Sequence, residues 1–132
     1  TKLKRVCVVL TKADKWALQE GKRLDAETAV KAVDSYQHAK KLLGNIFLNT
    51  LRRRLKPDTE VGFCMSSVFG FLDGAPNAVF LSEQKRKNRN TAPQIDPNQW
   101  VPYNAIEPFV FLLTGENVLN QFTIKKASEL KN

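Results

Sequence analysis

Cysteine and histidine are scarce in this chain of 132 residues, which has two cysteines and one histidine. Cys7 and Cys64 each lie inside an apolar run, without the short spacing that pairs of metal ligands have. With His38 as the single histidine, neither a zinc site nor a catalytic triad can be assembled in the usual way. We therefore interpret both cysteines as reduced core thiols and expect no metal site.

Long apolar runs are also absent. No uninterrupted run approaches the roughly 20 residues that cross a bilayer. The apolar stretch near the start has only about six residues, which is short for the core of a secretory signal. We expect a soluble, cytoplasmic protein, and 132 residues suit a single domain or a domain fragment. The first residue is Thr1, not Met, which favours a processed chain or a fragment.

Acidic residues are outnumbered by basic ones, 13 against 21, so the formal charge is +8. Such an excess suits nucleic acid, an acidic membrane surface or a phosphorylated ligand, and composition does not choose among them. Arg52, Arg53 and Arg54 precede Pro57, where cations complement the dipole at the end of a helix. We interpret them as a solvated helix end, with phosphate or nucleic-acid contact as the alternative.

A second basic cluster lies in the polar stretch from 82 to 99, which we expect to be a mobile surface insertion. No aromatic residues that could stack on bases are interleaved with the cluster. A solvated loop is the simpler interpretation, and contact with phosphate or nucleic acid is the alternative. The cluster consists of Lys85, Arg86, Lys87 and Arg89.

Two apolar runs predict strands. Residues 5–10 (RVCVVL) and 60–67 (EVGFCMSS) are short, rich in apolar residues and end at polar ones, as strands buried on both faces do. Helical spacing of apolar residues predicts a long helix over 26–55, with Asp25 as its cap and a break near Gly44. A helix between two strands predicts a parallel pair. We therefore expect an α/β fold of parallel strands flanked by helices.

The last third predicts one more helix. Asn104 is suited to cap it, Glu107 follows three positions later as in a capping box, and Pro108 is tolerated in a first turn. Gly115 either ends or interrupts this helix. Apolar spacing then continues from 118 to 124 toward a polar tail.

The segment Thr11-Lys12-Ala13-Asp14 directly follows the first strand, where open parallel sheets bind ligands. A fixed carboxylate at Asp14 can accept two parallel hydrogen bonds from adjacent N–H groups. Guanine presents such a pair on its Watson–Crick edge, whereas adenine presents an acceptor at N1. The stem of Lys12 can lie along the face of a base, and Thr11 can brace the loop.

Ser66 and Ser67 end the second strand and would lie beside this loop if the strands are parallel. Ser66 can orient Asp14 by a hydrogen bond, and the backbone N–H of Ser67 can donate to the guanine carbonyl oxygen. Together these residues are chemically complete for a base, although not for a nucleotide.

The motifs VCVVLTKAD and CMSSVFGF, in this order of elements, resemble the guanine-specificity and serine motifs in the carboxyl half of the G domain of TRAFAC-class P-loop GTPases. The resemblance covers most of the chain as an order of elements but only about eight residues as motif. It implies GTP or GDP as ligand, with Asp14 on the base, Lys12 covering it, Thr11 bracing the loop and the Ser67 amide reading the guanine oxygen.

Other parts of that family pattern are missing. The chain has no G-x-x-x-x-G-K-[S/T] to hold phosphates and no D-x-x-G to hold Mg²⁺. Val68 stands where many relatives have Lys or Leu, and the insertion at 82–99 suggests a divergent branch. We therefore expect hydrolysis, and any Mg²⁺, only if an upstream P-loop and switch region or a partner chain completes the site.

Other interpretations stay open. Asp14 fits an ordinary strand-to-helix turn in which it caps the helix. The chain could be a half-fold that kept its base-binding loops for another purpose. A noncatalytic basic module for nucleic acid or an acidic partner accounts for the +8 charge, and a scaffolding domain would bind neither ligand.

Overall fold

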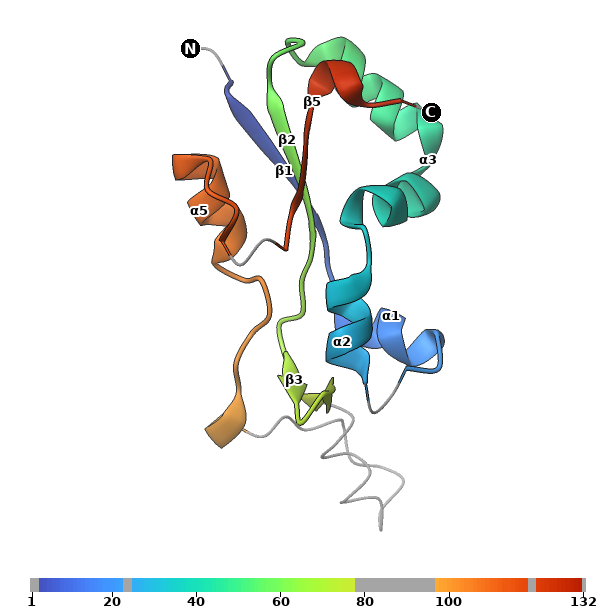
Figure 1. Cartoon of the computed structure of the whole chain (residues 1–132), viewed down its shortest axis with the longest axis vertical. Coiled ribbons are helices and arrows are strands. Elements are labelled where there is room, and N and C mark those ends of the chain that lie inside the picture. Colours follow the sequence, from blue (N-terminus) through green and yellow to red (C-terminus); the bar gives the residue numbers. More distant parts are fainter. Residues whose placement is uncertain (1–2, 23–24, 78–96, 119–120, 132) are drawn as a thin grey trace. The chain divides into compact units, whose positions relative to one another are not determined.

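The computed structural model describes residues 3–22, 25–77, 97–118 and 121–131 (Figure 1). Within these residues the α-helices are α1 (Ala13–Gln19), α2 (Ala26–Ala32), α3 (Ser35–Arg54) and α5 (Glu107–Thr114). The strands are β1 (Arg5–Leu10), β2 (Glu60–Met65), β3 (Phe71–Leu72), β4 (Ala75–Pro76) and β5 (Thr123–Lys126). Short 3-10 helices cover Pro97–Gln99 and Ala127–Glu129. The chain forms two compact units, described in turn: unit 1 is 1–10, 33–65 and 106–132, and unit 2 is 11–32 and 66–105.

Unit 1 is built on a three-stranded mixed sheet in the order β1-β2-β5. β1 and β2 are parallel, with Cys7 opposite Gly62, which confirms the predicted parallel pair. β5 runs antiparallel to β2, with Ile124 opposite Gly62. The apolar spacing from 118 to 124 therefore leads into a strand, which the sequence did not predict.

Helices cover the two faces of this sheet. Side chains of neighbouring strand residues point to opposite faces, so Phe63 and Cys64 lie on different sides. On one side Tyr36 of α3 meets Phe63 edge to face, with ring centroids 5.1 Å apart. On the other side Phe111 of α5 packs with Cys64 and Phe122. Figure 1 shows α3 and α5 on either side of the strands.

The predicted helix over 26–55 is two helices, not one. α2 ends at Ala32, and Asp34 begins α3 because its Oδ1 accepts hydrogen bonds from the backbone N–H groups of Tyr36 (3.0 Å) and Gln37 (3.3 Å). This cap satisfies donors that the first turn would otherwise leave unpaired. The expected break at Gly44 is confirmed as a kink with φ 78° inside α3.

α5 begins at a different residue from the one predicted. Asn104 has a left-handed backbone and lies two residues before the N-cap, which is Ile106. The Glu107 carboxylate accepts the Ile106 N–H at 3.1 Å, and Pro108 occupies the first turn as expected. Gly115 ends α5 in a left-handed conformation, which glycine adopts without strain.

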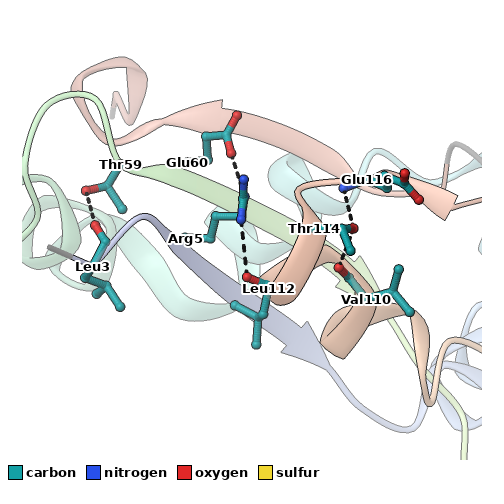
Figure 2. Close-up of polar contacts among 8 residues, drawn as sticks. All are labelled: Leu3, Arg5, Thr59, Glu60, Val110, Leu112, Thr114 and Glu116. Carbon is teal, nitrogen blue, oxygen red and sulfur yellow. Dashed lines mark hydrogen bonds and ion pairs between the residues drawn. The ribbon is translucent and has the colours of Figure 1, made fainter. Parts of the chain in front are cut away.

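Arg5 ties the start of β1 to the end of α5. Its Nε donates to Glu60 Oε2 at 2.9 Å, and its Nη1 donates to the Leu112 carbonyl at 3.4 Å (Figure 2). The guanidinium also packs so closely on Gly115 that a Cβ there would lie 2.7 Å from Arg5 Nε. A cation beside the last carbonyl groups of a helix complements its dipole.

Unit 2 contains α1, α2 and the hairpin of β3 and β4. Asp73 and Gly74 connect the strands with φ of 50° and 81°, the pattern of a tight two-residue hairpin turn. The backbone N–H of Glu27 in α2 donates to the Gly74 carbonyl at 3.0 Å, which holds the turn against the helix.

In the part of the chain that the structure describes, no helix is both long and apolar enough to cross a membrane.

Candidate functional site

Thr11, Lys12 and Asp14 lie at the start of α1, in unit 2. Lys12 is the N-cap residue and has a left-handed backbone (φ 60°, ψ 40°), which is uncommon for a residue other than glycine. The Lys12 carbonyl accepts the Trp16 N–H at 3.0 Å and so starts the helix. Thr11 and Lys12 are exposed and Asp14 is half-buried.

One backbone hydrogen bond joins this segment to the predicted serine segment. The N–H of Ala13, which is fully buried, donates to the Ser66 carbonyl at 2.9 Å. The structure therefore brings together the two segments that the motifs singled out, although they are more than 50 residues apart in the sequence.

Both segments line one cavity of about 480 Å³ in unit 2. This volume lies within the roughly 300 to 1,000 Å³ of sites for small organic ligands. The start of α1 contributes one acidic and two basic residues to the lining, and the second segment contributes two apolar residues. Its lining residues are Thr11, Lys12, Asp14, Lys15, Val68 and Phe69.

Asp14 is the acidic residue of this cavity. It is the second residue of α1, and the helix N-cap is Lys12, so Asp14 does not cap the helix through its side chain. A carboxylate in the first turn still complements the helix dipole. Among the described residues no donor binds the Asp14 carboxylate, which leaves its oxygens open to a ligand.

Ser66 and Ser67 do not take the positions that the motif suggested. Both are buried, and neither lines the cavity. The N–H of Ser67 donates to the Tyr103 carbonyl at 3.0 Å, so in this structure it is not free to read a guanine oxygen. The Ser67 hydroxyl accepts the Gly70 N–H at 3.1 Å. Within the described chain, no hydrogen bond joins the Ser66 hydroxyl to Asp14.

Hydrogen bonds to backbone carbonyl groups hold the loop after Ser67 in place. Trp100 Nε1 donates to the Val68 carbonyl at 2.6 Å, and Asn77 Nδ2 donates to the Phe69 carbonyl at 3.4 Å. Gly70 follows with φ 70°, and a Cβ there would lie 1.9 Å from the Val101 carbonyl oxygen. These contacts fix the backbone that carries the apolar wall of the cavity.

Sequence reasoning missed Lys15, Val68 and Phe69. Val68 and Phe69 are 63% and 43% exposed, which is unusual for two adjacent apolar residues in a loop that is hydrogen-bonded on both sides. The position of Val68 and Phe69 directly after the serine pair is the sequence signal that could have identified them. Lys15 gave none, because a lysine in the first turn of a helix is common on a solvated face.

The basic residues lie elsewhere. Arg52, Arg53 and Arg54 form the exposed last turn of α3 in unit 1, as the dipole argument predicted. The second cluster, Lys85, Arg86, Lys87 and Arg89, lies outside the described residues, as does the predicted insertion apart from 97–99.

Cys7 and Cys64 are free thiols of unit 1, in keeping with their interpretation as reduced core residues. The hydrogen bond between the two thiols raises the pKa of Cys64, and burial raises it further. The same hydrogen bond lowers the pKa of Cys7. A buried thiol with a raised pKa is a poor nucleophile, so Cys64 serves the packing of the core.

Comparisons with protein-family models, with curated proteins and with solved structures found no match to this chain.

Proposed function

We propose that this chain recognises the guanine base of a nucleotide in the cavity of unit 2. The observation that carries the proposal is the meeting of the TKAD segment and the residues after the serine pair around one cavity, with an unpartnered carboxylate in its wall. Resemblance to the guanine-specificity motif supports the same ligand. The proposal concerns the base, because the 132 residues contain no motif that holds phosphates or Mg²⁺.

Asp14 gives the site its selectivity. Its carboxylate would accept hydrogen bonds from the ring N–H and the exocyclic amine of guanine, a bidentate arrangement that charge strengthens. Adenine would place its N1 acceptor against the same oxygens and leave the carboxylate unpaired. A site built to hydrogen-bond its ligand rejects such an analogue strongly, because desolvated polar groups are then left without partners.

The faces of the base would meet apolar surface. The methylene stem of Lys12 lines the cavity on one segment, and the side chains of Val68 and Phe69 line it on the other. A flat aromatic base suits such walls, since it buries apolar area while its polar edge reaches Asp14. The left-handed backbone of Lys12 holds the side chain in place at some conformational cost, as residues at binding sites often do.

The guanine carbonyl oxygen needs a donor other than the Ser67 amide, which is bonded to Tyr103. Candidate donors among the lining residues are the ammonium group of Lys15 and the backbone N–H groups of Val68 and Phe69. Ser66 contributes through its carbonyl, which accepts the Ala13 N–H and sets the spacing of the two segments. We therefore assign Ser66 and Ser67 to positioning and Lys15 to ligand contact.

The wider proposal is that the chain is the guanine-recognising portion of a GTPase-like protein. GTP or GDP would then be held at its phosphates, with Mg²⁺, by residues supplied from outside this chain. Hydrolysis would then require both this chain and the residues outside it that hold the phosphates.

Binding of GDP, ADP and XDP to the isotope-labelled chain, followed by NMR chemical shifts, tests the proposal. We expect GDP to shift the amide signals of residues 11–15 and 68–69, and ADP to leave them in place. Asp14→Asn should weaken GDP binding about tenfold or more, the equivalent of one charge-assisted hydrogen bond. It should also improve XDP binding, because xanthine has a carbonyl in place of the exocyclic amine.

Asp73→Asn is the matched control, because it removes the same charge from an exposed turn of unit 2 outside the cavity. Its left-handed backbone also accepts asparagine well. Equal shifts with GDP and ADP, or an equal effect of the two substitutions, would refute guanine recognition by Asp14.

The alternative function is a noncatalytic basic module for nucleic acid or an acidic partner. The exposed Arg52, Arg53 and Arg54 favour it, since none of them has an ion-pair partner among the described residues. It predicts RNA or DNA binding that falls steeply with salt and weakens when these arginines become glutamine. Guanine selectivity without that salt dependence would exclude it.

A further inference from the structure

Unit 1 contains a second cavity, of about 320 Å³, where β1 and β2 begin and β5 ends. Its charged lining residues come from the segment before β1, the turn after α3, and all three strands. Four are cations and two are carboxylates, a net charge of +2: Lys4, Arg5, Lys56 and Lys126 against Asp58 and Glu60.

Arg5 already has partners within the protein. Its guanidinium forms the ion pair with Glu60 and the hydrogen bond to the Leu112 carbonyl, and it is packed against Gly115 (Figure 2). Arg5 and Glu60 are directly opposite each other in the parallel pair, so the sheet itself holds them in register. This ion pair therefore adds no net charge to the lining of the cavity.

The three lysines of the lining have no such partner. Lys4 precedes Arg5, Lys56 follows α3, and Lys126 is opposite Glu60 in the antiparallel pair. Glu60 pairs with Arg5 and makes no ion pair with Lys126. Among the described residues no carboxylate or other side chain binds any of the three ammonium groups. Like charges gathered around one concave surface repel one another and attract anions.

The turn that carries Lys56 is fixed by hydrogen bonds. The Thr59 N–H donates to the Lys56 carbonyl at 3.0 Å, and the Thr59 hydroxyl donates to the Leu3 carbonyl at 3.4 Å. The Glu60 N–H donates to the Lys4 carbonyl at 3.0 Å. The backbone positions of Lys4 and Lys56 are therefore set relative to each other before any ligand binds.

We propose that this cavity binds a small, multiply charged oxyanion of the polyphosphate class. Lysine ammonium groups bind phosphate oxygens as compact point charges. The small volume, and the absence of aromatic residues from the lining that the described residues form, suit phosphate groups better than nucleobases. The site is independent of the base cavity of unit 2, which has different lining residues.

Titration of the isotope-labelled chain with sodium tripolyphosphate at constant ionic strength tests the proposal. We expect saturable 1:1 binding that shifts the amide signals of residues 3–5, 56–60 and 126. Lys4→Gln with Lys56→Gln should weaken binding about a hundredfold, since two charge-assisted contacts are lost. Asp58→Asn should strengthen binding, because it removes a carboxylate from the lining.

Lys22→Gln with Lys41→Gln is the matched control, since both lysines are exposed and lie outside the cavity. It should change the affinity less than twofold, because an exposed charge outside the cavity contributes little. Non-saturable binding, an equal loss in the control or weaker binding in Asp58→Asn would overturn the proposal. So would tighter binding of a single-stranded RNA that tripolyphosphate cannot displace, because the surface would then serve nucleic acid.

Discussion

Gly62 lies in β2 directly against the ring of Phe111. A Cβ at this position would stand 2.8 Å from Phe111 Cε1 and 3.1 Å from Cδ1 and Cζ. Phe111 is fully buried and is held edge to face against Phe122, with ring centroids 5.9 Å apart, so the ring has little room to yield. We predict that Gly62→Ala destabilises unit 1 through overpacking.

The size of the effect follows from two opposing contributions. Overpacking of a core typically costs about 1 to 3 kcal/mol. Alanine recovers about 0.5 to 1 kcal/mol, because glycine loses more freedom on folding and Gly62 does not need a left-handed backbone. A net decrease of about 0.5 to 2 kcal/mol in the free energy of unfolding is therefore expected.

A second substitution separates the steric clash from other causes. Phe111→Leu alone should cost less than the roughly 3 to 5 kcal/mol of a phenylalanine-to-alanine change. In the double variant the alanine methyl group occupies space that the ring has left. The combined cost should therefore fall short of the sum of the single costs by about 1 kcal/mol.

Urea unfolding of the four proteins, followed by circular dichroism, measures these free energies. Labelling of Cys64 gives a local readout, because this thiol is fully buried in the same cluster as Phe111 and Phe122. Gly62→Ala should speed the labelling, and the double variant should be labelled more slowly than the two single effects together predict. Additive costs, or a Gly62→Ala protein as stable as the original, would show that the ring does not depend on this glycine.

Two further substitutions test backbone positions. Gly70→Ala should destabilise unit 2 by more than about 2 kcal/mol, because its Cβ would lie 1.9 Å from the Val101 carbonyl oxygen. Gly21→Ala has a similar φ of 71° but open space around it, so it should cost only about 1 kcal/mol. Unfolding followed by Trp100 fluorescence measures both costs, and equal costs would contradict the clash. Asp34→Ala should lower the thermal stability of unit 1 by about 1 kcal/mol through loss of the α3 cap, and Asp34→Asn, which keeps an acceptor, should restore most of it.

The fold could be predicted where the signal is local. The short apolar runs predicted β1 and β2, and the intervening helical spacing predicted their parallel pairing. β5 could not be predicted in the same way, because Thr123–Lys126 is too short for a period and depends on pairing with β2. The hairpin at Asp73-Gly74 carried a readable signal, since Asp-Gly is a favoured hairpin turn.

The candidate site could be predicted in outline. The polar stop after β1 pointed to Thr11, Lys12 and Asp14, and all three line the cavity. The role of the Ser67 amide could not be foreseen, because its acceptor is the carbonyl of Tyr103, 36 positions away. Whether a loop amide is free to bind a ligand depends on hydrogen bonds to residues far away in the sequence. A short motif carries no information about those residues.

The division into two units has a practical consequence for dissecting the molecule. The chain passes between the units four times, after residues 10, 32, 65 and 105. Each unit is therefore assembled from separate segments of the chain. Neither a truncation from one end nor a single proteolytic cut can isolate one intact unit. The cavity of unit 2 is lined by two segments that the Ala13–Ser66 hydrogen bond joins, and joining segments so far apart costs loop-closure entropy that contacts must offset. Minimal base-binding peptides cut from the TKAD segment should consequently be inert, and point substitutions within the whole chain are the way to assign each cavity its ligand.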